Sequence, residues 1–238
     1  VTGKTSLASN VITQGQQHYH GAVALPGSGD RTLTGTKIIV DGTLTSEDEL
    51  KSLIIDGEGM FGGLVGGELL NGFTVTGNTS LASSVTTISM QDYRRILNLI
   101  GEQAIVLTTE DNAIKFGEGV VGNGQDLSVD VGAAAIDLSN VRGVNKLEVN
   151  SSEVLRIADV DVGSIERIGE GKTAILADIT TQGPQHYHGA VTLPGSGNRA
   201  LTGTKIIVDG ALTSEDELKS LTIDGEGIFG GLIGGELL

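Results

Sequence analysis

The chain has 238 residues, including 37 glycines, only 3 prolines and no cysteine, so disulfides, thiolate nucleophiles and cysteine-ligated zinc are excluded. Aromatic residues make up 3% of the chain and hydrophobic residues 38%, so Val, Ile and Leu rather than aromatic rings are expected to fill the core. The formal net charge of −15 at pH 7 excludes the basic surface that nucleic acid binding requires.

The first notable segment, residues 13–30, reads TQGQQHYHGAVALPGSGD. On a strand, Tyr19 would point inward with Val23, so His18 and His20 would share the outer face. Two histidines at i and i+2 are candidate ligands for a transition metal, but no acidic or cysteine residue lies beside them in sequence as a third ligand. We therefore interpret them as polar residues on the surface of a strand and predict no metal site, with a metal-binding pair as the alternative.

Short glycine-rich and acidic motifs follow. G-x-G-x-x-G occurs three times, as GEGMFG (57–62), GEGVVG (117–122) and GEGIFG (225–230). None opens a predicted helix after a strand, so we interpret them as turns at coil corners rather than dinucleotide sites. GEGKT (169–173) lacks the first glycine of a phosphate-binding loop, because Glu166 stands there. The acidic TSEDELKSL (45–53 and 213–221) is expected to be a solvated turn.

The middle of the chain is more divergent. VTGKTSLAS (1–9) returns as VTGNTSLAS, which opens a partial copy over 75–87. Residues 89–103 then place Met90, Tyr93, Leu97 and Ile100 at helical spacing, which predicts a short helical or irregular insert. GNGQDLSV (122–129) partly resembles a calcium-binding nonapeptide, which makes Asp126 a candidate calcium ligand. In the divergent segment 88–170, Leu127 and Leu147 occupy matching places in VGNGQDLSVD (121–130) and VRGVNKLEVN (141–150).

Residues 171–238 repeat residues 3–70 without a gap, with 53 of 68 positions identical. His18 and His20 thereby return as His186 and His188, about eight coils away, so the four cannot share one site. The copies differ at Ile54/Thr222 and Ala24/Thr192, as expected if these positions meet solvent on strands. A period of about 20 residues with short strands and Gly turns predicts an all-β fold, a single parallel β-helix over 1–238. Because both ends carry the same module, we expect the sequence to be an excerpt of a longer array.

The phrases FTVTGNTSLASSVTT (73–87), TTQGPQHYHGAVTL (180–193) and LTGTKIIVDGAL (201–212) resemble the filamentous-haemagglutinin-like repeats of large bacterial surface adhesins. The resemblance covers about two thirds of the chain and weakens over 88–170. It implies a right-handed parallel β-helix in a secreted or outer-surface protein of a Gram-negative bacterium. The histidines and the 89–103 segment inherit no role from this family.

The expected function is therefore a non-catalytic stalk in an extracellular adhesin, with neighbouring repeats of the same chain as partners. An alternative is a carbohydrate- or protein-binding module that contacts a host or partner-cell surface through 89–103. A polysaccharide-processing β-helix enzyme is a third candidate. No catalytic residue or cofactor is predicted, no segment is expected to be embedded in a membrane, and the exposed ends of the solenoid predict end-to-end self-association.

Overall fold

The computed structural model describes residues 3–67, 69–215 and 220–234. They belong to two compact units, Val1–Val121 (unit 1) and Gly122–Leu238 (unit 2), each a parallel β-solenoid. All regular elements of the described residues are strands, so none of these residues forms a helix that could span a membrane. The chain makes about 10 turns of roughly 21 residues each, which confirms the predicted fold class and coil length.

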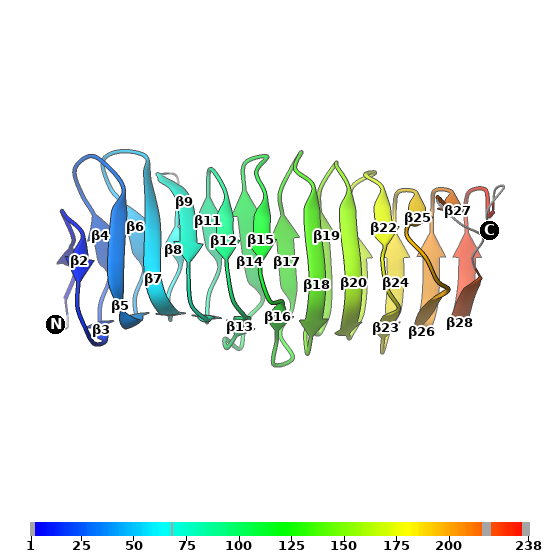
Figure 1. Ribbon diagram of the computed structural model, residues 1–238, viewed down its shortest axis with the longest axis horizontal. Helices are drawn as coiled ribbons and strands as arrows, with labels where there is room; N and C mark the ends of the chain where they lie inside the picture. The colour runs from blue at the N-terminus through cyan, green and yellow to red at the C-terminus, as the bar shows by residue number, and fades with distance from the viewer. Residues whose placement is uncertain (1–2, 68, 216–219, 235–238) are drawn as a thin grey trace. The chain divides into compact units, whose positions relative to one another are not determined.

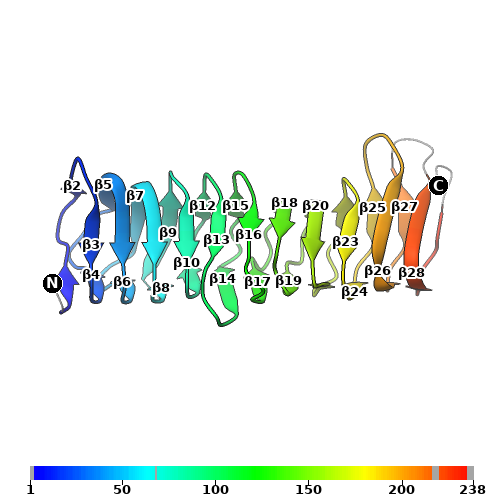
Figure 2. The ribbon, with the colours of Figure 1, turned by 90° about the horizontal axis from the view of Figure 1, so that it is seen from below.

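Most strands are short, and they follow one another closely in both units (Figures 1 and 2). The strands of unit 1 are β1 (Thr5–Ser6), β2 (Val11–Ile12), β3 (Gln17–Tyr19), β4 (Val23–Leu25), β5 (Arg31–Val40), β6 (Leu44–Ser46), β7 (Lys51–Phe61), β8 (Val65–Gly66), β9 (Leu70–Val75), β10 (Thr79–Leu81), β11 (Val85–Thr87), β12 (Gln91–Tyr93), β13 (Leu97–Leu99), β14 (Ile105–Thr109), β15 (Ile114–Phe116) and β16 (Val120–Val121). Those of unit 2 are β17 (Leu127–Asp130), β18 (Ile136–Arg142), β19 (Lys146–Asn150), β20 (Leu155–Val162), β21 (Ser164–Arg167), β22 (Thr173–Ile175), β23 (Ile179–Thr181), β24 (Pro184–Tyr187), β25 (Val191–Leu193), β26 (Arg199–Val208), β27 (Leu212–Ser214) and β28 (Leu221–Phe229).

Each coil of unit 1 contributes to three parallel ladders, which form three faces around the core. One ladder runs β1, β4, β6, β8, β11 and β14. The second runs β2, β5, β7, β9, β12 and β15, and the third β3, β5, β7, β10, β13 and β16. The long strands β5 and β7 serve two ladders because they bend at a corner, where their pairing shifts register.

The predicted stacking of equivalent apolar residues is confirmed in unit 2. Leu127 of β17 pairs in register with Leu147 of β19, and Leu147 pairs in turn with Ile165 of β21. All three side chains are buried. Apolar residues at every second position thus form columns along the stacked coils, and each coil completes the interior of its neighbours.

The expectation that variable positions face solvent holds in one case only. Ile54 is 39% exposed, but Ala24 and Thr192 are buried. Ala24 lies on β4, between β1 and β6 of the adjacent coils. An ion pair between Lys4, just before β1, and Glu47, just after β6, links the coils on either side of Ala24.

The helical or irregular insert predicted over 89–103 is wrong. Residues Gln91–Tyr93 form β12 and Leu97–Leu99 form β13, which pair with the coils on both sides. Both strands alternate buried and partly exposed residues. Of the four residues at helical spacing only Tyr93 and Leu97 point inward, whereas Met90 is half-buried and Ile100 is 43% exposed, so the spacing does not mark one apolar face. Segment 89–103 is therefore an ordinary part of a coil.

The two long module copies fold alike in their turns. The guanidinium group of Arg31 is buried and donates hydrogen bonds to backbone carbonyls of the turn 26–30 and to Leu7. Arg199 donates the corresponding bonds to the turn 194–198 and to Ile175. Each buried cation is thus satisfied by carbonyl oxygens of the PGSG turn that precedes it.

Candidate metal site

The HYH motifs lie at the ends of strands, with the tyrosine inward and both histidines outward as predicted. In unit 2, Tyr187 at the end of β24 is fully buried, and His186 and His188 flank it on the outer face. In unit 1, His18 lies on β3 and His20 directly follows that strand. Alternation along a strand explains the division, because neighbouring side chains point to opposite sides.

In unit 1 the next coil brings a carboxylate to the two histidines. The backbone N–H of Asp41 donates to the carbonyl oxygen of Tyr19 at 3.0 Å, which places Asp41 beside the end of β3. Nε2 of His18 lies 3.0 Å and Nδ1 of His20 lies 2.9 Å from Oδ2 of Asp41. We call His18, His20 and Asp41 the unit-1 cluster.

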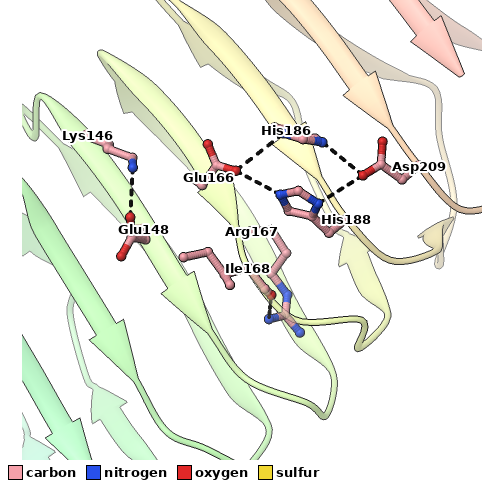
Figure 3. Close-up of polar contacts among 8 residues, drawn as sticks. All are labelled: Lys146, Glu148, Glu166, Arg167, Ile168, His186, His188 and Asp209. Carbon is pink, nitrogen blue, oxygen red and sulfur yellow. Dashed lines mark hydrogen bonds and ion pairs between the residues drawn. The ribbon is translucent and has the colours of Figure 1, made fainter. Parts of the chain in front are cut away.

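In unit 2 the equivalent histidines lie between two carboxylates, one from each neighbouring coil (Figure 3). Oδ2 of Asp209, which follows β26, is 3.0 Å from Nε2 of His186 and 3.0 Å from Nδ1 of His188. On the other side, Oε1 of Glu166 on β21 is 3.4 Å from Nδ1 of His186 and 2.9 Å from Nε2 of His188. We call Glu166, His186, His188 and Asp209 the unit-2 cluster.

Both clusters are open to solvent, with side-chain exposure from 24% for His186 to 49% for His20. Hydrogen bonds from His18 and then His20 lower the pKa of Asp41 from its ordinary value. The carboxylate is therefore ionised over the neutral range. Two imidazoles and an anionic oxygen thus converge at one exposed place on the outer face of each unit.

The residue after Glu166 points the opposite way. Arg167 is fully buried, and its Nη2 donates a 2.9 Å hydrogen bond to the carbonyl oxygen of Glu153. Figure 3 shows its guanidinium group away from the four residues of the unit-2 cluster. Burial lowers the pKa of Arg167, which has no part in the outer-face chemistry.

Sequence reasoning found the four histidines but missed all three carboxylates. The sequence separation is 23 between His18 and Asp41, again 23 between His186 and Asp209, and 22 between Glu166 and His188. Each carboxylate therefore lies one coil away from its histidines. A search for acids at one coil's distance, rather than beside the histidines, would have found them. The stacking of coils brings residues about one turn apart into contact, so the acids that meet the histidines do not lie beside them in sequence.

The coil that continues beyond the partial copy 75–87 carries no such cluster at the corresponding place. Asp92 and Arg94 stand where His18 and His20 stand in the first copy, and Nε of Arg94 donates to Oδ2 of Asp92 at 3.0 Å. Gly117 donates its N–H to the carbonyl oxygen of Tyr93, as Asp41 does to Tyr19, so a glycine replaces the aspartate. The coil therefore holds an ordinary ion pair at this place instead of a histidine pair.

The other candidate sites have structural contacts. Asp126 accepts hydrogen bonds from the side chain of Asn145, at 2.7 Å, and from the backbone N–H of Lys146, at 3.1 Å, so its Oδ1 binds the next coil. Gly57 of GEGMFG lies at the bend of β7 with a φ of 146°, which agrees with a coil corner. In the acidic 45–53 motif, Asp48 accepts a bond from the N–H of Gly27. Part of its copy, residues 216–219, lies outside the described residues.

The fold and these clusters define a repeat protein of the parallel β-solenoid class, with paired histidines on its outer face. No known family model matches the chain, and no curated protein or solved structure matches it either.

Proposed function

We propose that this chain is a non-catalytic spacer segment of a large bacterial surface adhesin, with filamentous-haemagglutinin-like repeats, that acts outside the cell. The observation that carries the proposal is the duplication of structure along with sequence. β5 and β26, from the two copies, have identical patterns of burial, and Lys172 pairs with Glu215 as Lys4 pairs with Glu47. Such repetition is expected of a segment whose role is to add length, because every copy contributes the same structure.

The interior also supports a mechanical role. Parallel ladders link successive coils within each unit, and aliphatic columns such as Leu127, Leu147 and Ile165 fill the space between the faces. Each coil depends on its neighbours, so a pull along the ladders is resisted by many hydrogen bonds together.

The alternative of a recognition insert at 89–103 loses its basis, because β12 and β13 occupy that segment. An enzyme would need a set of reacting groups that the spacer does not. We favour the spacer because the outer-face polar clusters lie in module positions and recur with the module.

The test is to delete one complete module, residues 3–170, from the adhesin that carries this segment. If the segment is a spacer, the deletion variant should be displayed normally and the purified adhesin should keep its affinity for its target. In electron micrographs the adhesin should extend a shorter distance from the cell. Loss of affinity with normal display would contradict the proposal. A second test exposes the isolated chain to a panel of glycans, and saturable binding or turnover there would also contradict it.

A further inference from the structure

We propose that the unit-1 and unit-2 clusters each bind one divalent transition metal ion, with Zn²⁺ as the expected ion, through two histidines and one aspartate. This inference goes beyond the spacer function and does not depend on it. The ligands would be His18, His20 and Asp41 in unit 1. In unit 2 they would be His186, His188 and Asp209, the carboxylate whose Oδ2 lies 3.0 Å from a nitrogen of each histidine, whereas Glu166 also lies close to both histidines on their other side.

The donor set determines the class of metal. Neutral imidazole nitrogen suits zinc, copper and nickel, whereas calcium and magnesium take oxygen ligands almost entirely. Two histidines and one carboxylate are a known zinc set, in which the fourth position of the tetrahedron is left to water or another ligand. The chain has no cysteine that would compete for the ion.

The distances fit such an ion. Ligand atoms about 2.0–2.1 Å from a tetrahedral zinc ion lie roughly 3.3 Å from one another. The nitrogen-to-oxygen separations are 3.0 and 2.9 Å in unit 1 and 3.0 and 3.0 Å in unit 2. Shifts of a few tenths of an ångström in exposed side chains would therefore admit the metal.

The same atoms converge in both units. The first histidine presents Nε2 and the second presents Nδ1 to the aspartate, in unit 1 and again in unit 2. The two imidazole rings are also held alike, with ring centroids 3.8 Å apart in each unit. The middle copy, where Asp92, Arg94 and Gly117 take these places, shows that the coil does not impose the arrangement.

Glu166 gives the unit-2 cluster an additional feature. With a metal on the Asp209 side, the other nitrogens of His186 and His188 face Oε1 of Glu166 and can donate their N–H groups to it. A carboxylate in this place fixes the ring orientation and makes the imidazole a stronger ligand. Glu166 is thus a positioning residue, and we expect unit 2 to bind the ion more tightly than unit 1.

A bound ion would also act on the fold. His186 and Asp209 lie in successive coils, and Glu166 joins the coil before them, so the site connects three coils of unit 2 through their side chains. Because the ion binds the folded coils, it stabilises them by an amount that grows with the logarithm of its free concentration once the site is filled. The inferred site is therefore a metal clamp on the outer face.

The test is calorimetric titration of the tag-free chain with ZnCl₂, repeated in competition with a chromogenic chelator. We expect two equivalents of unequal affinity, of which H186A/H188A removes the tighter and H18A/H20A the weaker. D209N should also abolish the tighter site. E166Q should weaken it by about 10–100-fold while leaving the stoichiometry at two. The matched control is D92N in the middle copy, which should change neither site.

Melting curves supply a second measurement. Zn²⁺ should raise the melting temperature and EDTA should reverse the rise, whereas the variant without all four histidines should show no shift. These side chains are exposed, so the metal-free variants should melt close to the parent chain. A lack of saturable Zn²⁺ binding, or binding that survives in the variant without the four histidines, would overturn the proposal. Retention of the tight site in D209N would overturn the assignment of Asp209.

Discussion

The hydroxyl group of Tyr187 donates a 2.9 Å hydrogen bond to the side-chain oxygen of Gln185, and both side chains are fully buried in unit 2. Nε2 of Gln185 donates in turn to the carbonyl oxygen of Thr202, at 2.9 Å, in the next coil. Gln91 and Tyr93 form the same buried pair in unit 1, with a 2.9 Å hydrogen bond. In a Q-x-Y sequence on one strand, the glutamine side chain therefore accepts the hydrogen bond of the tyrosine hydroxyl, and the two form a hydrogen-bonded pair inside an aliphatic core.

Replacing Gln185 with alanine should destabilise unit 2 by about 2–4 kcal/mol, because it leaves the Tyr187 hydroxyl buried without its partner and opens a cavity. Urea unfolding followed by circular dichroism measures the loss. The matched control is Gln16→Ala, an exposed residue in the first copy, which should change stability by less than about 0.5 kcal/mol. Equal effects from the two substitutions would show that the pair contributes nothing.

Stability should fall at alkaline pH. Burial raises the pKa of Tyr93 and of Tyr187 above the ordinary tyrosine value. Above about pH 10 the unfolded chain loses these protons while the folded chain keeps them. Deprotonation therefore stabilises the unfolded state relative to the folded state. The free energy of unfolding should be unaffected by these groups below that pH. Above it, the loss should approach about 1.4 kcal/mol per pH unit for each tyrosine.

Denaturant titrations on both sides of this pH, with tyrosinate absorbance followed in parallel, measure the effect. Ionisation of Tyr93 and Tyr187 should coincide with unfolding. Y187F should make the pH dependence shallower, since one of the two buried groups is then absent. Ionisation of both tyrosines in a chain that retains its native circular dichroism would contradict the prediction.

Phe73→Ala should cost about 3–5 kcal/mol in unit 1. The ring of Phe73 is buried, and its centroid lies 5.3 Å from that of Phe61 and 6.1 Å from that of Tyr93, both in edge-to-face contact. Phe73→Leu keeps much of the volume and should cost roughly 1.5 kcal/mol or less. Thermal or urea unfolding would measure both, and an alanine variant as stable as the leucine variant would argue against a packed aromatic cluster.

Gly57→Ala should destabilise unit 1 by more than about 2 kcal/mol or prevent folding. Gly57 has a φ of 146°, and a Cβ there would stand 2.0 Å from the carbonyl oxygen of Gly35 in the previous coil. Gly15→Ala is the matched control, because no atom lies within 4 Å of the Cβ it would add. A melting temperature for the Gly57 variant equal to that of the Gly15 variant would refute the requirement for glycine at this bend.

The 238-residue chain should self-associate through β28. Leu53 and Phe61 of β7 are fully buried, whereas their counterparts Leu221 and Phe229 of β28 are partly exposed. Among the described strands, β28 pairs with β26, and the edge away from β26 presents backbone groups that a second copy would pair with. Sedimentation should show a concentration-dependent increase in mass that Ile228→Lys reduces. A chain that stays monomeric at high concentration would contradict self-association through β28.

Much of the fold could be predicted from the chain alone. The matching places of Leu127 and Leu147 in consecutive repeats predict their stacking, and the structure places them in register. Alternation also predicts correctly that Tyr187 points inward and His186 outward. The prediction for 89–103 is wrong because it gives the helical spacing more weight than the repeat. Gln91 and Tyr93 match Gln17 and Tyr19 in the first copy, and this match indicates a strand.

The order of residues by itself therefore determined the solenoid, since period and alternation are local properties of the chain. The tertiary structure alone decided the chemistry of the outer face. Asp41 and Asp209 are distant in sequence from the histidines that they contact, and Glu166 approaches from the coil on the other side. A residue's partners across a ladder depend on the length of each turn, and the turn from Leu147 to Ile165 is shorter than the turn from Tyr93 to Phe116. Only the folded coils settle that register, and with it which side chains meet.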